Sequence, residues 1–342
     1  MPPSLWPRVV AAPDKFRGTA TASDVAAAIV HSADAAGWEC VSRALADGGE
    51  GTLEVLACLG GAWRQTVVTG PLGDPVDARW LFVGTTAYIE MAQASGLIVV
   101  GGAEHNDALA ASTFGTGELI ASAIGQGARR VVVTLGGSAT TDGGFGALRA
   151  LEPLPRLRGI ELIVACDVET VFVDAAADFG PQKGATTAQV SLLRRRLERL
   201  ADIYATEHQV DVRDVPGSGA AGGLAGGLLV VGARLNSGFD LVADAVGLDE
   251  ALDGARLVVT GEGFLDAESF HGKVVGGVCA RAASAGVPVL IVCGDFGDFG
   301  SLPTGVTVVS MTQRFGRERS WGDPTGAIAE IVAETLNQQN SS

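Results

Sequence analysis

The residues best able to do chemistry stand in short glycine-rich segments that follow apolar runs. The first such segment, residues 12–18 (APDKFRG), places Asp14 beside two cations, Lys15 and Arg17. Ligands of open α/β sheets bind at the carboxyl ends of the strands. An acid and two cations at such a position suit an anionic ligand, while a turn with a solvated ion pair is the structural alternative.

The second segment, residues 46–52 (ADGGEGT), opens a predicted helix. Gly48 and Gly49 let the backbone approach a ligand, and a helix N-terminus attracts phosphate or carboxylate. Asp47 and Glu50 would repel a bare anion, but they could hold a divalent metal that bridges to phosphate. Capping of the helix by these two acids is an equal alternative.

The third segment, residues 135–144 (LGGSATTDGG), follows a strongly apolar run. Its hydroxyls and backbone N–H groups could cradle a phosphate as an anion-binding nest. The candidates for this role are Gly136, Gly137, Ser138 and Thr140. Asp142 in the same segment is a candidate metal ligand or base.

Three further positions complete the set of candidates. Asp167 follows a predicted strand and could bind metal, and Lys183 lies in a glycine-flanked turn suited to clamp phosphate or carboxylate. Residues 260–266 carry two acids, and Lys273 follows at the start of the next predicted helix; acids and a lysine beside a helix N-terminus are the groups expected for Mg²⁺-assisted phosphoryl transfer. The candidates there are Gly261, Glu262, Gly263, Asp266 and Lys273, whereas His271 is more typical of a cap.

Lysine usage points to the same segments. The chain has 24 Lys and Arg in total, and Lys stands only at positions 15, 183 and 273. The compact, mobile ammonium of lysine cannot be copied by arginine. We therefore expect catalytic roles for Lys15, Lys183 and Lys273, together with Asp47 and Asp266.

These segments need a scaffold of alternating strands and helices. Both chain ends alternate in this way, which predicts a parallel sheet with helices on both faces, while residues 65–91 read as a β-meander. The simplest layout is a doubly wound domain from both ends, with a second module inserted; two sequential domains are the alternative. Strands are predicted at 8–12, 40–45, 65–69, 78–83, 87–91, 130–135, 161–165, 256–260, 287–292 and 306–310, and helices at 21–35, 50–59, 115–125, 191–207, 272–285 and 325–336.

Composition narrows the function classes. The chain has 342 residues and a net charge of −15, which argues against nucleic-acid or membrane partners. The five cysteines form no C-x-x-C pair, which favours reduced thiols in the cytoplasm, and the N-terminus does not read as a signal peptide.

Walker A, protein-kinase and nucleophile-elbow motifs are absent. Residues 217–222 match G-x-G-x-x-G, and Asp240 stands at a tolerable distance for a ribose ligand. The match is a weak dinucleotide signal and is more typical here of a tightly packed Gly/Ala helix.

Taken together, these segments resemble the bacterial glycerate kinase family, of the glycerate 2-kinase type, over nearly the whole chain. Each motif alone is weak, but their common order is specific. The motifs that carry the resemblance are residues 12–18, 46–52, 70–73 (GPLG), 89–97 (IEMAQASGL), 112–120 (STFGTGELI), 136–144, 165–168 (ACDV), 179–185 (FGPQKGA), 219–223 (GAAGG), 260–263 (TGEG) and 272–273 (GK).

The resemblance implies ATP-dependent, Mg²⁺-assisted phosphorylation of D-glycerate, with 2-phosphoglycerate favoured as the product. It implies a flavodoxin-like doubly wound domain from residues 1–64 and 250–336, an inserted mixed α/β, restriction-enzyme-like domain over 65–249, and a frayed tail over 337–342. A monomer or homodimer is expected. The chain departs from the family pattern at 150–160, 169–172 and Phe264, so a non-catalytic ATP- or hydroxy-acid-binding paralogue is an alternative, and a dinucleotide-dependent oxidoreductase is a more distant one.

Overall fold

The computed structural model describes residues 6–16, 18–270 and 272–341. The chain divides into two compact units, and each is treated by itself. The terminal unit comprises the chain up to Asp47 and from Phe239 onward, and the inserted unit comprises Gly48–Gly238. The boundaries between the two units thus lie between Asp47 and Gly48 and between Gly238 and Phe239. The sequence predicted these boundaries near residues 64 and 249.

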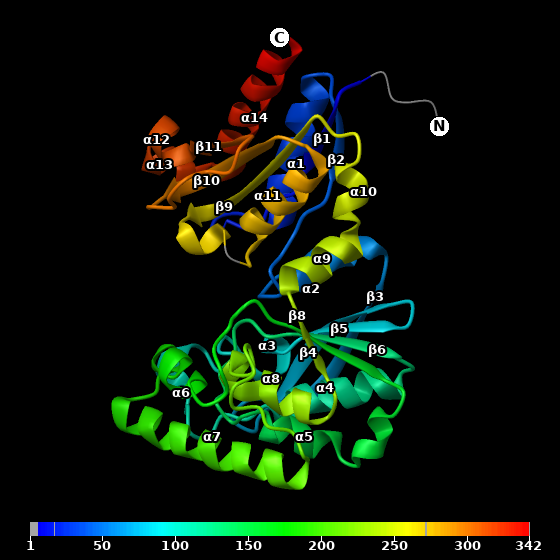
Figure 1. The fold of residues 1–342 in the computed structure, drawn as a ribbon, viewed down its shortest axis with the longest axis vertical. Helices are drawn as coiled ribbons and strands as arrows, with labels where there is room; N and C mark the ends of the chain where they lie inside the picture. Colours follow the sequence, from blue (N-terminus) through cyan, green and yellow to red (C-terminus); the bar gives the residue numbers. More distant parts are fainter. Residues whose placement is uncertain (1–5, 17, 271, 342) are drawn as a thin grey trace. The chain divides into compact units, whose positions relative to one another are not determined.

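The terminal unit is built on a parallel sheet whose strands lie in the order β11-β10-β9-β1-β2 (Figure 1). If β1, β2, β9, β10 and β11 are renumbered 1 to 5 along the chain, their order in the sheet, read from β2, is 2-1-3-4-5. This is the flavodoxin-like arrangement. The prediction of a flavodoxin-like domain from both chain ends is therefore confirmed. The strands are β1 (Arg8–Ala11), β2 (Glu39–Ser42), β9 (Leu257–Leu265), β10 (Val289–Phe296) and β11 (Val306–Ser310).

Helices cover both faces of this sheet. Val9 and Ala11 of β1 pack in one apolar cluster with α1 and α14, while the intervening Val10 is equally buried on the other face. Burial on both faces explains why these strands read as continuous apolar runs. The helices are α1 (Ala22–Ala35), α9 (Gly238–Val246), α10 (Leu248–Leu252), α11 (Val274–Ala285), α12 (Met311–Phe315), α13 (Arg317–Gly322) and α14 (Pro324–Asn340), with the 3₁₀ turn η5 (Ala267–Phe270).

The ends of the first and last helices have local causes. Thr21 and Asp24 form a reciprocal capping box at the start of α1, which explains why the helix begins there. Helix α14 continues to Asn340 and so includes most of the segment expected to fray after Leu336. Asn340 accepts a hydrogen bond from Trp38 Nε1 at 3.0 Å and donates one to the Ala36 carbonyl oxygen at 3.1 Å, which anchors this end of the helix.

The inserted unit contains a mixed sheet in the order β3-β4-β5-β6-β7-β8. The meander predicted over residues 65–91 is confirmed as the antiparallel pairs β3–β4 and β4–β5, after which β5 to β8 run parallel. The strands are β3 (Ala62–Thr69), β4 (Pro75–Val83), β5 (Thr86–Glu90), β6 (Arg130–Thr134), β7 (Glu161–Ala165) and β8 (Arg234–Asn236). The mixed α/β character expected of this unit is confirmed.

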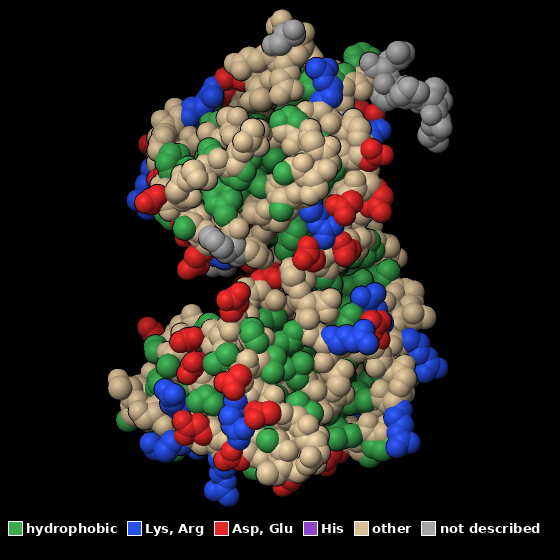
Figure 2. All heavy atoms as spheres, viewed as in Figure 1, with side chains coloured by type: hydrophobic (Ala, Val, Ile, Leu, Met, Phe, Trp, Pro, Cys, Tyr) green, Lys and Arg blue, Asp and Glu red, His purple; other side chains and the backbone are tan. Residues whose placement is uncertain are grey.

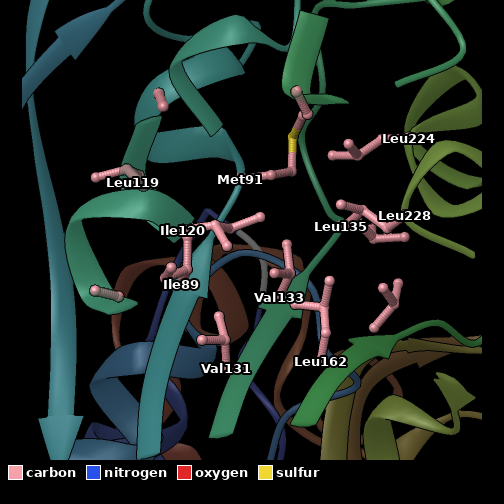
Figure 3. Packing of buried hydrophobic residues seen from close by; sticks show 14 of the residues in the cluster. Ile89, Met91, Leu119, Ile120, Val131, Val133, Leu135, Leu162, Leu224 and Leu228 are labelled. Atoms are coloured by element: carbon pink, nitrogen blue, oxygen red, sulfur yellow. The ribbon is translucent and has the colours of Figure 1, made fainter. Parts of the chain in front are cut away.

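The main core of the inserted unit lies between this sheet and helices α4, α5 and α8. Figure 3 shows Ile89, Val131 and Val133 of the strands beside Leu119 and Ile120 of α4. A second core joins α6 and α7, whose outer faces carry interspersed acidic and basic side chains (Figure 2). The helices are α2 (Thr52–Leu56), α3 (Ala92–Ser95), α4 (Phe114–Gly125), α5 (Phe145–Leu151), α6 (Ala175–Phe179), α7 (Thr187–Glu207) and α8 (Ala220–Val230), with 3₁₀ turns η1 (Ala57–Leu59), η2 (Ala103–His105), η3 (Leu154–Leu157) and η4 (Pro181–Lys183).

Candidate active site

In the terminal unit, acidic residues gather where β1, β2 and β9 end. The backbone N–H of Asp14 donates to the Gly261 carbonyl oxygen at 3.0 Å, which holds the loop after β1 against β9. These two strands flank the point where the strand order reverses, which is the ligand site of doubly wound sheets. Asp14, Asp47 and Glu262 lie close enough to influence one another's charge. Glu262 stands within β9, which continues to Leu265, whereas the sequence predicted that this strand ends at residue 260.

The carboxyl groups of this acidic cluster disfavour one another's charge. Burial, and then the negative charge of Asp47, raise the pKa of Asp14 to about 7, although the nearby Lys15 ammonium acts in the opposite direction. Burial also raises the pKa of Glu262, whose Oε1 is buried without a hydrogen-bond donor among the described residues. An orphaned carboxylate oxygen beside two further acids is a setting that a cation would stabilise.

The acids do not form a ready-made cage. Within residues 6–16, 18–270 and 272–341, no three His, Cys, Asp or Glu side chains are grouped so that they could hold a metal ion by themselves. Mg²⁺ is usually held by one or two carboxylates together with substrate phosphates and water. The acidic cluster is thus of a kind that could hold Mg²⁺ together with phosphate oxygens and water.

Asp266 and Lys273 have clear local partners. Asp266 caps η5, because its Oδ1 accepts hydrogen bonds from the Ser269 N–H at 3.1 Å and hydroxyl at 3.3 Å. Lys273 precedes α11, and its ammonium lies 3.2 Å from the exposed Glu268 carboxylate. Ser269 also hydrogen-bonds the Glu262 carboxyl, and the charge of Lys273 lowers the pKa of Glu262. Both predicted residues thus lie at the edge of the acidic cluster.

Gly261 serves close packing of the strands. A Cβ atom on Gly261 would lie 1.9 Å from the Val292 carbonyl oxygen of β10. Gly263 faces a similarly close neighbour, because a Cβ on Gly294 would lie 2.3 Å from the Gly263 carbonyl oxygen. These glycines let β9 and β10 stay paired along the segment that carries Glu262.

In the inserted unit, the predicted loops meet at the carboxyl ends of β5, β6 and β7. A Cβ on Gly136 would lie 2.7 Å from Gly49 Cα and 2.9 Å from the Glu50 backbone nitrogen. Gly48, with φ of +80°, lies against Ala165 at the end of β7. Two of the glycine segments singled out in the sequence are therefore in direct backbone contact, which only glycine permits at this distance.

Buried Glu90 at the end of β5 fixes the start of α2. Its Oε1 accepts a hydrogen bond from the Leu53 N–H at 3.0 Å. This contact holds the Gly48–Glu50 segment in place, and Glu50 itself is exposed. Sequence reasoning placed Glu90 in a family motif but gave it no role, because an acid at the end of an apolar strand does not reveal which helix it caps.

Asp142 is engaged in an extensive set of hydrogen bonds. Its Oδ2 accepts from the Thr113 N–H at 2.8 Å, the Thr113 hydroxyl at 2.9 Å and the Gly146 N–H at 3.2 Å, while Oδ1 accepts from the Gly144 N–H at 3.1 Å. Burial raises the pKa of this carboxyl, and the donors oppose that rise. This bonding favours a role in ordering the loop over the role of metal ligand.

Lys183 is buried, with 2% of its surface exposed. Its ammonium donates to the Thr140 carbonyl oxygen at 2.7 Å, which joins the 180–185 turn to the 135–144 loop. Burial lowers the pKa of Lys183 to about 7, and the charge of Asp142 raises it in part. A buried lysine of this kind is typical of a site that receives an anion.

The other predicted loop residues occupy the same region. Leu97 N–H donates to the Gly137 carbonyl oxygen at 2.8 Å, and Ser138 is bridged to Gly96. Asp167 Oδ1 accepts from the Gly238 N–H at 2.8 Å and so holds the loop after β7. Arg17, expected to bind anions, and His271 lie outside the described residues.

The G-x-G-x-x-G match at residues 217–222 is explained by packing. A Cβ on Gly219 would lie 2.4 Å from the Val171 carbonyl oxygen, and one on Gly222 would lie 2.0 Å from that of Thr140. Asp240, the possible ribose ligand, instead pairs with Arg281 at 2.8 Å. These contacts account for the glycines without a dinucleotide, in line with the tightly packed helix that the sequence favoured.

The fold and the site define a two-unit α/β protein with acidic and glycine-rich loops at its strand ends. The family model for the glycerate kinase family matches residues 9–154 and 152–317, and the chain belongs to this family.

Named relatives and a solved structure agree with this assignment. The chain is 40% identical over 331 residues to glycerate 2-kinase of Escherichia coli K12, covering 85% of this chain and 86% of the relative. It is 39% identical to glycerate kinase of Bacillus subtilis 168, covering 84% and 85% of the two chains. A crystal structure assigned as glycerate kinase 2 of Salmonella typhimurium LT2 superposes with a TM-score of 0.84 at 33% identity, covering 98% of this chain and 99% of that one.

No helix in the described part of the chain combines the length and the apolar character needed to cross a bilayer.

Proposed function

We propose that this protein phosphorylates glycerate with ATP as the phosphoryl donor. The observation that carries the proposal is family membership across nearly the whole chain, together with glycerate kinases among the relatives at about 40% identity. The acidic cluster of the terminal unit supplies groups of a kind that phosphoryl transfer uses, namely acids that can hold Mg²⁺.

The acidic cluster is the proposed place of Mg²⁺. Glu262, whose buried Oε1 has no donor in the described chain, and Asp14 or Asp47 are its proposed ligands, with nucleotide phosphates completing the shell. When bound, Mg²⁺ would neutralise charge on the phosphates. Asp47 and Asp266 are the proposed acceptors of the hydroxyl proton, and Lys15 and Lys273 are proposed to offset phosphate charge at the same strand ends.

The glycine loops of the inserted unit are proposed to hold an anion through backbone N–H groups. Gly48, Gly49, Gly136 and Gly137 lie at the strand ends where such groups are presented. Lys183 supplies the balancing positive charge. Transfer to the 2-hydroxyl of D-glycerate is the favoured outcome, because glycerate 2-kinase is among the relatives that cover most of the chain.

The cellular setting follows from the thiols and the substrate class. All five cysteines are free thiols in the structure, as a reducing compartment would keep them. We propose a cytoplasmic enzyme, active as a monomer or homodimer, that acts on a small hydroxy acid.

The direct test is ADP release from Mg·ATP with D-glycerate, with L-glycerate and no acceptor as controls. ADP formation that depends on D-glycerate supports the proposal. Folded protein that binds ATP without releasing ADP would instead support a non-catalytic binding protein of the same family. Asp47→Asn and Asp266→Asn test the proton acceptors, and normal kcat in both would remove that assignment.

A further inference from the structure

Unsatisfied polar atoms collect around the turn at residues 139–141 of the inserted unit. The side-chain oxygens Asn106 Oδ1, Thr140 Oγ1 and Thr141 Oγ1 are buried and have no hydrogen-bond partner among the described residues. Thr140 and Thr141 are 0% and 2% exposed as whole residues. Buried polar groups are nearly always paired, so atoms of this kind require a partner from outside the protein.

The orientation of the Asn106 amide is determined by its contacts. Its Nδ2 donates to the Ala139 carbonyl oxygen at 2.9 Å and to the Lys183 carbonyl oxygen at 2.8 Å. A flipped amide would place its oxygen against two carbonyl oxygens, which is repulsive. Oδ1 must therefore point away from both carbonyls, where it is buried and can only accept a hydrogen bond.

Lys183 adds a cation to the same turn. Of its three N–H donors, one is used by the Thr140 carbonyl oxygen at 2.7 Å, and the ammonium lies 5.8 Å from the centroid of the Phe179 ring. No second hydrogen-bond acceptor for the ammonium is found in the described chain. The neighbouring Asp142 carboxylate already accepts hydrogen bonds from Thr113, Gly144 and Gly146. A second anion is thus the natural partner for the remaining lysine donors.

The backbone beside the turn is strained. Ala221 has φ of 52°, a left-handed conformation that residues other than glycine rarely adopt, and its neighbour Gly222 lies against Thr140. Strain of this type persists where the surroundings enforce it, and it concentrates at ligand sites. Bound water alone would not explain why the oriented Asn106 oxygen, the buried Lys183 and the strained Ala221 backbone occur together.

We propose that Asn106 is a specificity residue that reads the hydroxyl of the hydroxy acid that is not phosphorylated, while Lys183 binds its carboxylate. An amide oxygen accepts a hydrogen bond but cannot take up the proton of a reacting hydroxyl. Asn106 therefore suits a hydroxyl that keeps its proton, which is the 3-hydroxyl if transfer is to the 2-hydroxyl. Thr140 and Thr141 hydroxyls complete the hydrogen bonds of the ligand. This inference rests on the proposed function and names the part of the substrate that the site selects.

The test compares D-glycerate with D-lactate, which lacks the 3-hydroxyl, in the wild type and in Asn106→Leu. In the wild type we expect kcat/KM, or affinity measured by calorimetry, to favour D-glycerate by at least ~100-fold, since sites built to hydrogen-bond a hydroxyl reject analogues that lack it. In Asn106→Leu that preference falls about tenfold or more. An unchanged preference would overturn the proposal and leave Asn106 a structural link between loops.

Two further measurements keep the outcome distinct from folding defects and from failure of the proposed function. Thr140→Val removes a buried hydroxyl without changing volume, so we expect weaker D-glycerate binding and an unchanged or higher Tm. A higher Tm with unaltered binding would mean that the hydroxyl meets only water. Asn236→Leu, at an exposed position of β8, is the matched control. Because calorimetry needs no turnover, D-glycerate binding that depends on Asn106 but gives no ADP would contradict the kinase proposal, while the contact between Asn106 and the 3-hydroxyl would still be supported.

Discussion

The Lys183 ammonium donates a hydrogen bond of 2.7 Å to the carbonyl oxygen of Thr140, and both residues are buried. This contact ties a glycine-flanked turn to the loop that follows β6. A buried cation with a single protein acceptor is costly to the fold, so the contact favours a role in binding over a role in stability.

Replacement of Lys183 by Met is expected to abolish most activity while stabilising the fold. The unfolded lysine keeps its proton up to its ordinary pKa of 10.5, whereas the folded one loses it near pH 7. Between these values the unfolded state binds more protons, so wild-type stability rises with pH. The variant should gain on the order of 1–3 kcal/mol at pH 6, and this gain should shrink towards pH 10.

Chemical denaturation at pH 6 and pH 9 measures this difference. Lys273→Met is the matched control, because its side chain is partly exposed and pairs at the surface with Glu268. The control should change stability by less than ~0.5 kcal/mol at either pH. A Lys183→Met variant that is destabilised at pH 6 would show that the lysine supports the fold.

Asp142→Asn is expected to destabilise the inserted unit. The amide replaces one oxygen with a donor that faces N–H groups of Thr113, Gly144 or Gly146. Leaving such buried groups unsatisfied costs roughly 2–4 kcal/mol. Thermal unfolding of this variant beside Asp74→Asn, a change at an exposed turn position, tests the loop-ordering role; equal Tm values would argue against it.

Gly222→Ala is expected to damage the fold more than a left-handed glycine in open space. The new Cβ would lie 2.0 Å from the Thr140 carbonyl oxygen, whereas Gly232, with φ of +89°, has nothing within 4 Å. Gly232→Ala should cost about 1–2 kcal/mol from backbone strain alone, and Gly222→Ala should cost more and also weaken D-glycerate binding. Similar unfolding free energies for the two variants would contradict the packing account.

Mg²⁺ is expected to raise the Tm of the protein in the presence of ADP, and less so in Glu262→Gln. The substitution keeps the shape of the side chain but removes the charge at the buried Oε1 that lacks a donor. Ligands that bind only the folded state stabilise it by mass action. Glu268→Gln, at an exposed acid nearby, should behave like the wild type, and an equal Mg²⁺ shift in the Glu262 variant would place the metal elsewhere.

Much of this arrangement was predictable because the signals were local. The start of α1 after Thr21, the meander of β3 to β5 and the burial of both faces of β1 and β9 follow from spacing and apolar runs. The placement of Asp14 in a loop at the carboxyl edge of a parallel sheet followed from its position after an apolar run. Each of these predictions uses residues close together in the chain or a rule of topology.

Other features depend on distant pairings that spacing does not encode. Helix α14 continues past Leu336 because Asn340 bonds to Trp38, and Asp142 is saturated by Thr113 from another loop. Asn106 lies in a segment without a recognised motif, and its importance arises only from its bonds to Ala139 and Lys183. An asparagine before an aspartate reads as a simple turn in the sequence.

The central claim, phosphorylation of glycerate, is tested most directly by the phosphorus NMR spectrum of the products from Mg·ATP and D-glycerate. A new phosphomonoester signal split into a doublet by a single neighbouring proton is the predicted result, because phosphate on the 2-oxygen couples to one C–H. A triplet would place the phosphate on the 3-oxygen. A spectrum in which folded, ATP-binding protein yields no phosphomonoester would contradict the claim.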